Sequence, residues 1–344
     1  MTWIPLLLTD PSPCLRYLVF TDLLNRNVDD SEVQELVEMR ESDQLVKELY
    51  QLQKSNGSWD TISTIQIPFG DNLQLTSMAL QRLGYFGFDS SHPVIKKAVE
   101  FLFSKQKEDG SWPMPGKKKL TDEELGYQIM PIQTAIPLLG LVMCGYSTDK
   151  RSEKAFEWLT AQILEDGAWP VGLSAGNYGG IAGYRRLAHS RWGCRSTTTT
   201  VLSCFAYHPK RSKSAEAKRA LDLILGTTSK QKNNLGFIIS RLIGLERSIG
   251  RITYMAKFDI AYILNLCWRI GATQDDKRIF DLIEFIKSEQ GQYGLWECIK
   301  NPQATRWLTF DLLRSLLNLE KNVDWISLEP RTPFQAYHKK IKRF

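Results

Sequence analysis

The sequence lacks several patterns that define common classes of protein. Its six cysteines include no C-x2-C pair, which argues against a zinc ribbon and indicates free thiols in a reducing compartment. No run of about 18 apolar residues occurs, and the first residues combine a short apolar stretch with Asp and Pro but no basic segment before it. We therefore expect a cytoplasmic protein with neither a signal peptide nor a membrane span.

Charge and residue alternation exclude further classes. The 344 residues carry a formal net charge of +6, which favours an anionic ligand or a peripheral contact with a membrane surface and does not suggest binding to nucleic acid. No strand pattern of useful length is present, whereas 43% of the residues are hydrophobic and can form a large core. The sequence therefore predicts an all-α protein.

What the sequence does contain is a repeated phrase, Q-x3-G-x-W. It occurs at 53–59, 106–112 and 290–296, with one extra residue at 162–169, and as a degenerate copy ending in Phe at 231–237. A recurrence every 50 to 70 residues or so is typical of repeat architectures, in which each repeat is one supersecondary unit. In each copy we expect Gly to end a helix with a positive φ, Trp to bury its ring against the next unit and Gln to bond the backbone.

Two types of helical segment alternate along the chain. Segments that are apolar all round are expected inside a ring, and segments with one apolar face are expected outside it. The inner candidates are 13–25, 72–83, 126–143, 195–207, 257–270 and 305–319, and the outer candidates are 33–53, 93–102, 149–162, 214–225 and 275–290, with a further one in the basic tail from Phe334. The pattern predicts a single domain over residues 1–344, folded as an α/α toroid of the α6/α6 type.

The repeated phrase, its period and the alternation of helices resemble the terpenoid cyclases and the β-subunits of protein prenyltransferases, which share squalene-cyclase-type repeats. The resemblance covers nearly the whole chain. It implies a central cavity at the end of the inner ring that binds an isoprenoid, a small-molecule partner, without a cofactor. It does not fix the reaction, because a fold does not determine a function.

One chemistry of these families is acid-initiated cyclisation, in which an Asp of a D-x-D-D motif protonates an alkene inside an aromatic cavity. No D-x-D-D occurs here, and the nearest string, 273–276, begins an outer helix and is interpreted as an N-cap. Asp259 lies in an otherwise apolar inner segment and is our candidate catalytic acid; a salt bridge to Lys257 or to a nearby Arg is the alternative. Asp311 also lies in an apolar inner segment, and the same two interpretations, a catalytic acid or a salt bridge, apply to it.

The other chemistry is protein prenylation, for which the resemblance implies diphosphate and zinc ligands on a run like R-x2-K-x2-D-G-C-Y. The comparable run here matches at Arg186, Gly193 and Cys194, and it has His189 in place of Lys, Trp192 in place of Asp and Arg195 in place of Tyr. Because the Asp and a suitably placed later His are missing, no metal site is expected. Arg186, His189 and Arg195 precede an inner helix and are candidate diphosphate ligands; a solvated loop is the alternative.

Five aromatic residues are candidates for the wall of a substrate pocket, although aromatic residues at helical spacing also serve as plain core: Tyr127, Trp192, Tyr254, Tyr262 and Trp307. The leading interpretation is a cyclase-like or prenyltransferase-like enzyme that acts on an isoprenoid. The alternative is a non-catalytic toroid that sequesters an apolar ligand or a partner helix. An aromatic cavity with one buried acid would favour the enzyme, and a filled ring centre would favour the binding module. Substrate, product and oligomeric state are left open.

Overall fold

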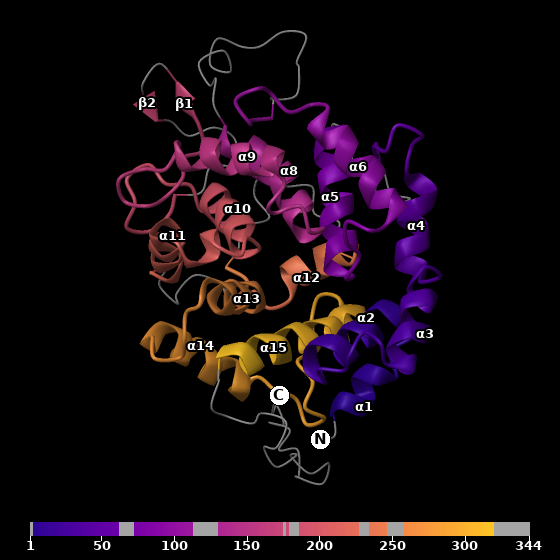
Figure 1. Cartoon of the computed structure of the whole chain (residues 1–344). Coiled ribbons are helices and arrows are strands. Elements are labelled where there is room, and N and C mark those ends of the chain that lie inside the picture. The colour runs from indigo at the N-terminus through magenta and orange to yellow at the C-terminus, as the bar shows by residue number, and fades with distance from the viewer. Residues whose placement is uncertain are drawn as a thin grey trace, which may run out of the picture.

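The helices form two concentric layers (Figure 1). The computed structural model describes residues 3–61, 72–112, 130–174, 177–178, 186–226, 234–245 and 258–319. The inner layer consists of α5 (Asn72–Tyr85), α8 (Pro131–Met143), α10 (Arg195–Ala206), α13 (Ile260–Ile270) and α15 (Thr305–Leu319), each packed on the next. The outer layer consists of α3 (Ser31–Arg40), α4 (Gln44–Leu52), α6 (Pro93–Phe103), α9 (Lys150–Thr160), α11 (Ala215–Leu225) and α14 (Lys277–Ser288). The predicted all-α toroid is confirmed, and its limits of 1–344 stay a prediction.

The remaining elements are short. They are α1 (Trp3–Leu8), α2 (Pro13–Leu18), the π-helical segment η1 (Val19–Leu23), α12 (Phe237–Leu242), the 3-10 segments η2 (Arg211–Lys213) and η4 (Pro302–Ala304), and an antiparallel pair of two-residue strands, β1 (Leu173–Ser174) and β2 (Asn177–Tyr178). The N-terminal elements close the ring, because α15 packs on α1 and η1. Arg314 of α15 pairs with Asp22 of η1 at 3.1 Å, and Arg306 pairs with Asp10 at 3.4 Å.

Burial separates the two layers as the sequence predicts. In α8 every residue from Pro131 to Val142 is buried, whereas α9 buries only the side that faces it. Residues 197–200 of α10, four consecutive threonines, are also buried. Packing in the inner ring therefore overrides the weak helical preference of β-branched residues.

One predicted outer helix is divided in two. The expected helix over 33–53 breaks between α3 and α4, where the Asp43 carboxylate accepts a hydrogen bond from the backbone N–H of Leu45 at 2.9 Å and so caps a new helix. The expected N-cap in the string 273–276 is confirmed, because the Asp276 carboxylate accepts from the N–H of Arg278 at 2.9 Å. Local capping chemistry therefore decides where the outer helices begin.

Four copies of the repeated phrase fold into one recurring turn, which we call the Gln–Trp turn. The indole N–H of each Trp donates to a carbonyl ten residues earlier at 2.6–2.8 Å, and its backbone N–H donates to a Thr hydroxyl on the next inner helix at 3.0–3.1 Å. The tryptophans and their threonine partners are Trp59 with Thr76, Trp112 with Thr134, Trp169 with Thr198 and Trp296 with Thr309. Each turn thus ends one outer helix and holds the following inner helix.

Glycine and glutamine add a link to the next outer helix. Gly110 has φ +91, and a Cβ at this position would lie 2.4 Å from the carbonyl oxygen of Lys154 in α9, so only glycine fits. The side-chain amide of Gln106 donates to the carbonyls of Gly110 and Arg151, both at 2.9 Å. Gln53 repeats this pattern between α4 and α6. The turn therefore joins three helices, which explains its recurrence around the ring.

Candidate functional site

The described part of the degenerate fifth copy, residues 234–237, differs from the common Gln–Trp turn. Gly236 keeps a left-handed φ of 79°, but Phe237 follows it directly and begins α12. α12 packs against α5, all its residues from Phe237 to Arg241 are buried, and it is drawn between α5 and α13 in Figure 1. This short helix therefore lies across the interior of the ring rather than in its wall, and the sequence analysis did not predict it.

Asp259 positions α12. One carboxylate oxygen accepts from the N–H of Gly236 at 3.2 Å and the other from the N–H of Ile238 at 2.7 Å, so this side chain caps α12 although it precedes α13. Asp259 is fully buried, and burial raises the pKa of its carboxyl to about 6 against the opposing effect of these backbone hydrogen bonds. The described contacts of the candidate catalytic acid are thus those of a helix cap. Lys257, its alternative partner, lies outside the described residues.

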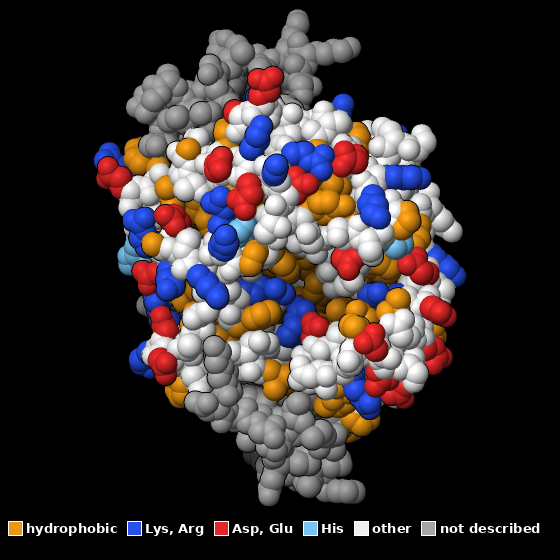
Figure 2. Space-filling view, viewed as in Figure 1, with side chains coloured by type: hydrophobic (Ala, Val, Ile, Leu, Met, Phe, Trp, Pro, Cys, Tyr) orange, Lys and Arg blue, Asp and Glu red, His pale blue; other side chains and the backbone are white. Residues whose placement is uncertain are grey.

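Asp311 lies at the ring centre and is paired. It contacts the guanidinium of Arg314, which also binds Asp22, and both side chains line a cavity of about 10 Å³, enough for about one water molecule. Burial raises the pKa of the Asp311 carboxyl, against the lowering effect of Arg314. Figure 2 shows a hollow near the centre of this face, with Lys or Arg and apolar side chains on its wall. The described residues at the ring centre thus border this small cavity, and the hollow of Figure 2 opens near the centre of the same face.

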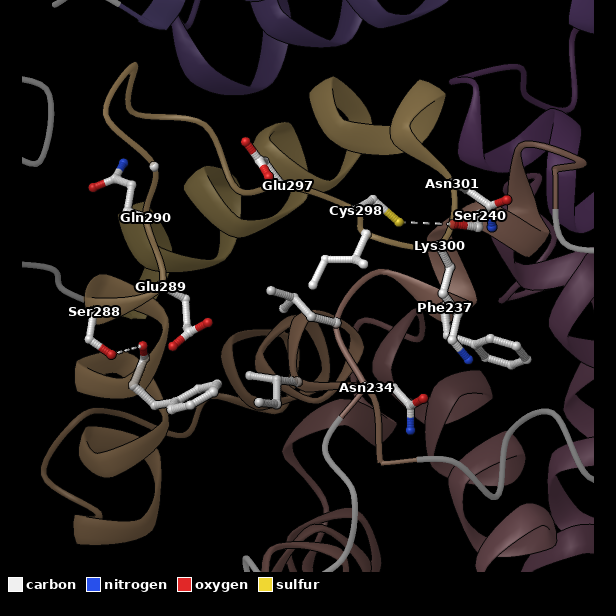
Figure 3. A pocket seen from close by; sticks show the side chains of 15 residues that line it. Asn234, Phe237, Ser240, Ser288, Glu289, Gln290, Glu297, Cys298, Lys300 and Asn301 are labelled. Carbon is white, nitrogen blue, oxygen red and sulfur yellow. Dashed lines mark hydrogen bonds between the residues drawn. The ribbon is translucent and has the colours of Figure 1, made fainter. Parts of the chain in front are cut away.

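A much larger cavity, of about 540 Å³, lies beside α12 (Figure 3). Its floor combines Phe237 and Ser240 of α12 with Ile260 of α13 and Cys298, and all four side chains are buried. The hydroxyl of Ser240 lies 3.5 Å from the Cys298 sulfur. We call this space the side cavity. Of these residues, only Phe237 was noted from the sequence, as the end of the degenerate fifth copy, and none was predicted to line a cavity. The Trp missing from that copy was the signal that could have indicated the site.

The rim of the side cavity is mixed in character. Glu289, at the end of α14, lies on one side, and Lys300 lies on the other, as Figure 3 shows. Two apolar rim residues are unusually exposed, Phe285 at 39% and Ile299 at 90%. An apolar floor under a rim with charges of both signs can hold a hydrocarbon with a polar end.

The basic candidates lie elsewhere. Arg186 is exposed, pairs with Cys194 in a backbone bridge and donates from its side chain to the carbonyl of Ser190 at 3.3 Å. His189 is exposed with φ +62, and Arg195 is the first residue of α10, where burial lowers the pKa of its guanidinium. None of the three lines the side cavity or the central cavity. Their role as diphosphate ligands stays a prediction.

The aromatic candidates divide between core, surface and undescribed segments. Tyr262 lines the central cavity and donates from its hydroxyl to Ser203 at 2.6 Å. Trp307 is buried, with ring centroids 5.6 Å from Tyr85 and 5.4 Å from Phe86, whereas Trp192 is 40% exposed. The two other candidates, Tyr127 and Tyr254, lie outside the described residues.

The part of the chain that the structure describes contains neither a metal-binding cluster nor a membrane-spanning helix. No group of three or more His, Cys, Asp or Glu side chains is arranged to hold a metal ion there. Nor does any helix within the described ranges combine the length and the hydropathy required to span a bilayer.

Comparisons with known proteins point to one superfamily. Residues 29–182 match the model of the squalene-hopene cyclase C-terminal domain. A squalene–hopene cyclase of Zymomonas mobilis is 30% identical over 153 residues, which cover 44% of this chain and 21% of that protein. A lanosterol synthase of Aspergillus fumigatus is 29% identical over 131 residues, which cover 37% of this chain and 16% of that protein. The chain therefore spans about a fifth or less of the length of these relatives.

Solved structures with a similar arrangement include a type II terpene cyclase, MstE, from Scytonema. It shares 12% sequence identity and a TM-score of 0.32, over 79% of this chain and 95% of that chain. A protein from Actinoplanes gives 11% identity and a TM-score of 0.30, over 80% of this chain and 97% of that chain.

Proposed function

We propose that this terpenoid-cyclase-like α/α toroid binds an isoprenoid in the side cavity. The observation that supports this proposal is the cavity itself, about 540 Å³ with a buried apolar floor and a polar rim. Pockets for small molecules commonly measure about 300 to 1,000 Å³ and have this kind of lining. The ligand's hydrocarbon chain lies on Phe237 and Ile260, and its polar end lies near Lys300 and Glu289.

The contacts of the two buried acids favour binding over acid-initiated chemistry. An acid that protonates an alkene must present its proton to the substrate. Both carboxylate oxygens of Asp259 are engaged by backbone N–H groups, and Asp311 is engaged by Arg314. We therefore assign Asp259 to positioning α12 and Asp311 to the ion pair at the ring centre, and this chain to ligand binding.

The first test is equilibrium dialysis of labelled geraniol and farnesol against the protein. Each methylene moved from water to an apolar site contributes about 0.8 kcal/mol, so the affinity should rise from geraniol to farnesol. Phe285→Ser should weaken the binding of farnesol by about tenfold, because the ring lines the cavity and truncating an apolar contact of this size costs about 1.5 kcal/mol or more.

The matched control is Phe280→Ser on the same helix. Phe280 is 46% exposed, similar to Phe285, but it does not line the side cavity, so its variant should bind farnesol like the wild type. Absence of binding to the wild-type protein, or equal losses in both variants, would contradict the proposed site. Conversion of the bound alcohol into a cyclised product would contradict the assignment to binding without chemistry.

A further inference from the structure

The two ends of α12 border different cavities. Phe237 and Ser240, in its first turn, line the side cavity, and Leu242, its last residue, lines the central cavity together with Tyr262 and Asp311. One short helix therefore separates the side cavity from the ring centre.

Both ends of α12 are flanked by closely packed glycines. At its start, a Cβ on Gly236 would lie 3.1 Å from the Leu308 side chain and 3.2 Å from the Cys298 sulfur. After its end, a Cβ on Gly244 would lie 2.7 Å from the guanidinium of Arg82 in α5. Both glycines have a positive φ, 79° and 84°. Glycine tolerates many backbone conformations, so each of these positions can also adopt a different one.

α12 has no cap of its own. Its N-cap residue is a glycine without a side chain, and the cap is supplied from another segment by Asp259, 21 residues further along the chain. A six-residue helix is too short to be stable by itself in water, because nucleation is costly and few hydrogen bonds follow. The helix is therefore stabilised by its contacts with the ring. Most of its side chains are apolar, so an apolar ligand can make the same contacts in their place.

We propose that α12 is a displaceable partition, and that isoprenoids too long for the side cavity bind by moving α12 out of the ring interior. This inference rests on the proposed function and specifies its ligand class. Short isoprenoids occupy the side cavity with α12 in place. Longer chains extend past the position of Phe237 toward Tyr262 at the ring centre, and they bind only to the state with α12 displaced. Their observed affinity is lowered by the small population of that state.

Cys298 provides the means to lock α12. The Ser240 hydroxyl oxygen is 3.5 Å from the Cys298 sulfur, so Ser240→Cys places a second thiol within bonding reach. Mild oxidation joins the two thiols into a disulfide with loss of two hydrogens to the added oxidant, and a reductant reverses the reaction. The same sample can thus be measured locked and unlocked, with Ser240→Ala and the wild type taken through the same treatment as controls.

Binding of geraniol and of geranylgeraniol is measured by dialysis in both states, after mass spectrometry confirms the disulfide. Locking should weaken geranylgeraniol binding at least tenfold more than it weakens geraniol binding, because the disulfide alters the floor of the side cavity for both ligands but blocks only the longer one from the ring centre. Geranylgeraniol should also accelerate amide hydrogen exchange at residues 238–242 of the unlocked protein. Equal geranylgeraniol affinity in both states, or slower exchange at 238–242, would overturn the partition while the proposed function stands. Failure of both alcohols to bind in either state would instead overturn the proposed function.

Discussion

The four Gln–Trp turns and the segment around α12 occupy corresponding places in the repeat but are held in different ways. Each regular turn has three kinds of anchor, namely an indole N–H bonded within its own unit, a backbone N–H bonded to a Thr of the next inner helix, and a glycine with a positive φ. At the fifth place the Trp is replaced by Phe237, and the two oxygens of Asp259 are the hydrogen-bond acceptors. The regular turns are thus anchored by their own Trp, whereas the fifth place is anchored by a carboxylate from another segment and borders the side cavity.

This difference suggests how one fold combines rigidity with binding. Removing one anchor from the turns of Trp59, Trp112 or Trp169 should cost stability without altering the side cavity, because no residue of these three turns lines it. Changing Asp259 should alter the ring locally, because it acts on a short helix that borders two cavities. The following substitutions test that contrast, starting with the largest expected effect.

Trp112→Ala should lower the free energy of unfolding by about 3–5 kcal/mol. The ring is 3% exposed and its indole N–H donates to the carbonyl of Leu102 at 2.8 Å, so the substitution leaves both a cavity and an unpaired carbonyl. Chemical denaturation monitored by circular dichroism measures the change. Trp192→Ala is the control, because that ring is 40% exposed and should change stability by no more than about 0.5 kcal/mol. Equal effects of the two substitutions would show that the turn is not an anchor.

Asp259 should make the free energy of unfolding depend on pH, whereas the Trp anchors of the regular turns do not titrate. Its pKa in the folded protein, about 6, is above the ordinary value of 3.8, so the folded state binds the proton more tightly. The corresponding stability is fully present below the unfolded-state pKa and is lost as the pH rises through about 6. Relative to Asp259→Asn, the wild type should lose about 3 kcal/mol between about pH 3 and about pH 7. Urea unfolding of both proteins over this range measures the difference.

The control for this pH dependence has the opposite sign. Hydrogen bonding from Arg278 lowers the pKa of the Asp276 carboxyl, so its contribution to stability is present above the unfolded-state pKa and is lost as the pH falls. Relative to Asp276→Asn, the wild type should therefore gain stability as the pH rises. If the stability difference between wild type and Asp259→Asn changed with pH in the same direction as that between wild type and Asp276→Asn, Asp259 would not be a buried cap.

The regular part of the ring could be predicted from the sequence because its signals are local. The spacing of Gln106, Gly110 and Trp112 contains the whole turn, and the predicted helices at 72–83, 195–207 and 305–319 agree with α5, α10 and α15 to within two residues. One local signal was missed. Residues 149–151 and 276–278 both read D-K-R, and in each case the Arg bonds back to the capping Asp and pairs with the preceding outer helix.

The site could not be predicted in the same way because its contacts are not local. α12 depends on Asp259, which is 21 residues away and was interpreted as a candidate acid on the basis of its apolar neighbours. The side cavity combines Phe237, Ile260, Phe285 and Cys298, which no short motif connects. Conversely, Arg186, His189 and Arg195 were grouped by their proximity in sequence, and the structure places none of them in the lining of either cavity.

The central claim is that the ligand lies beside α12, between the degenerate fifth copy and the regular turn at 290–296. Its most direct test is photoaffinity labelling of the whole chain with a farnesol analogue that carries a diazirine, followed by peptide mass spectrometry. We expect labelled residues within 234–240, 285–291 and 297–301, the segments that line the side cavity, and competition by unlabelled farnesol. Labelling confined to residues 186–195 would contradict the account and would support the basic cluster as the ligand site.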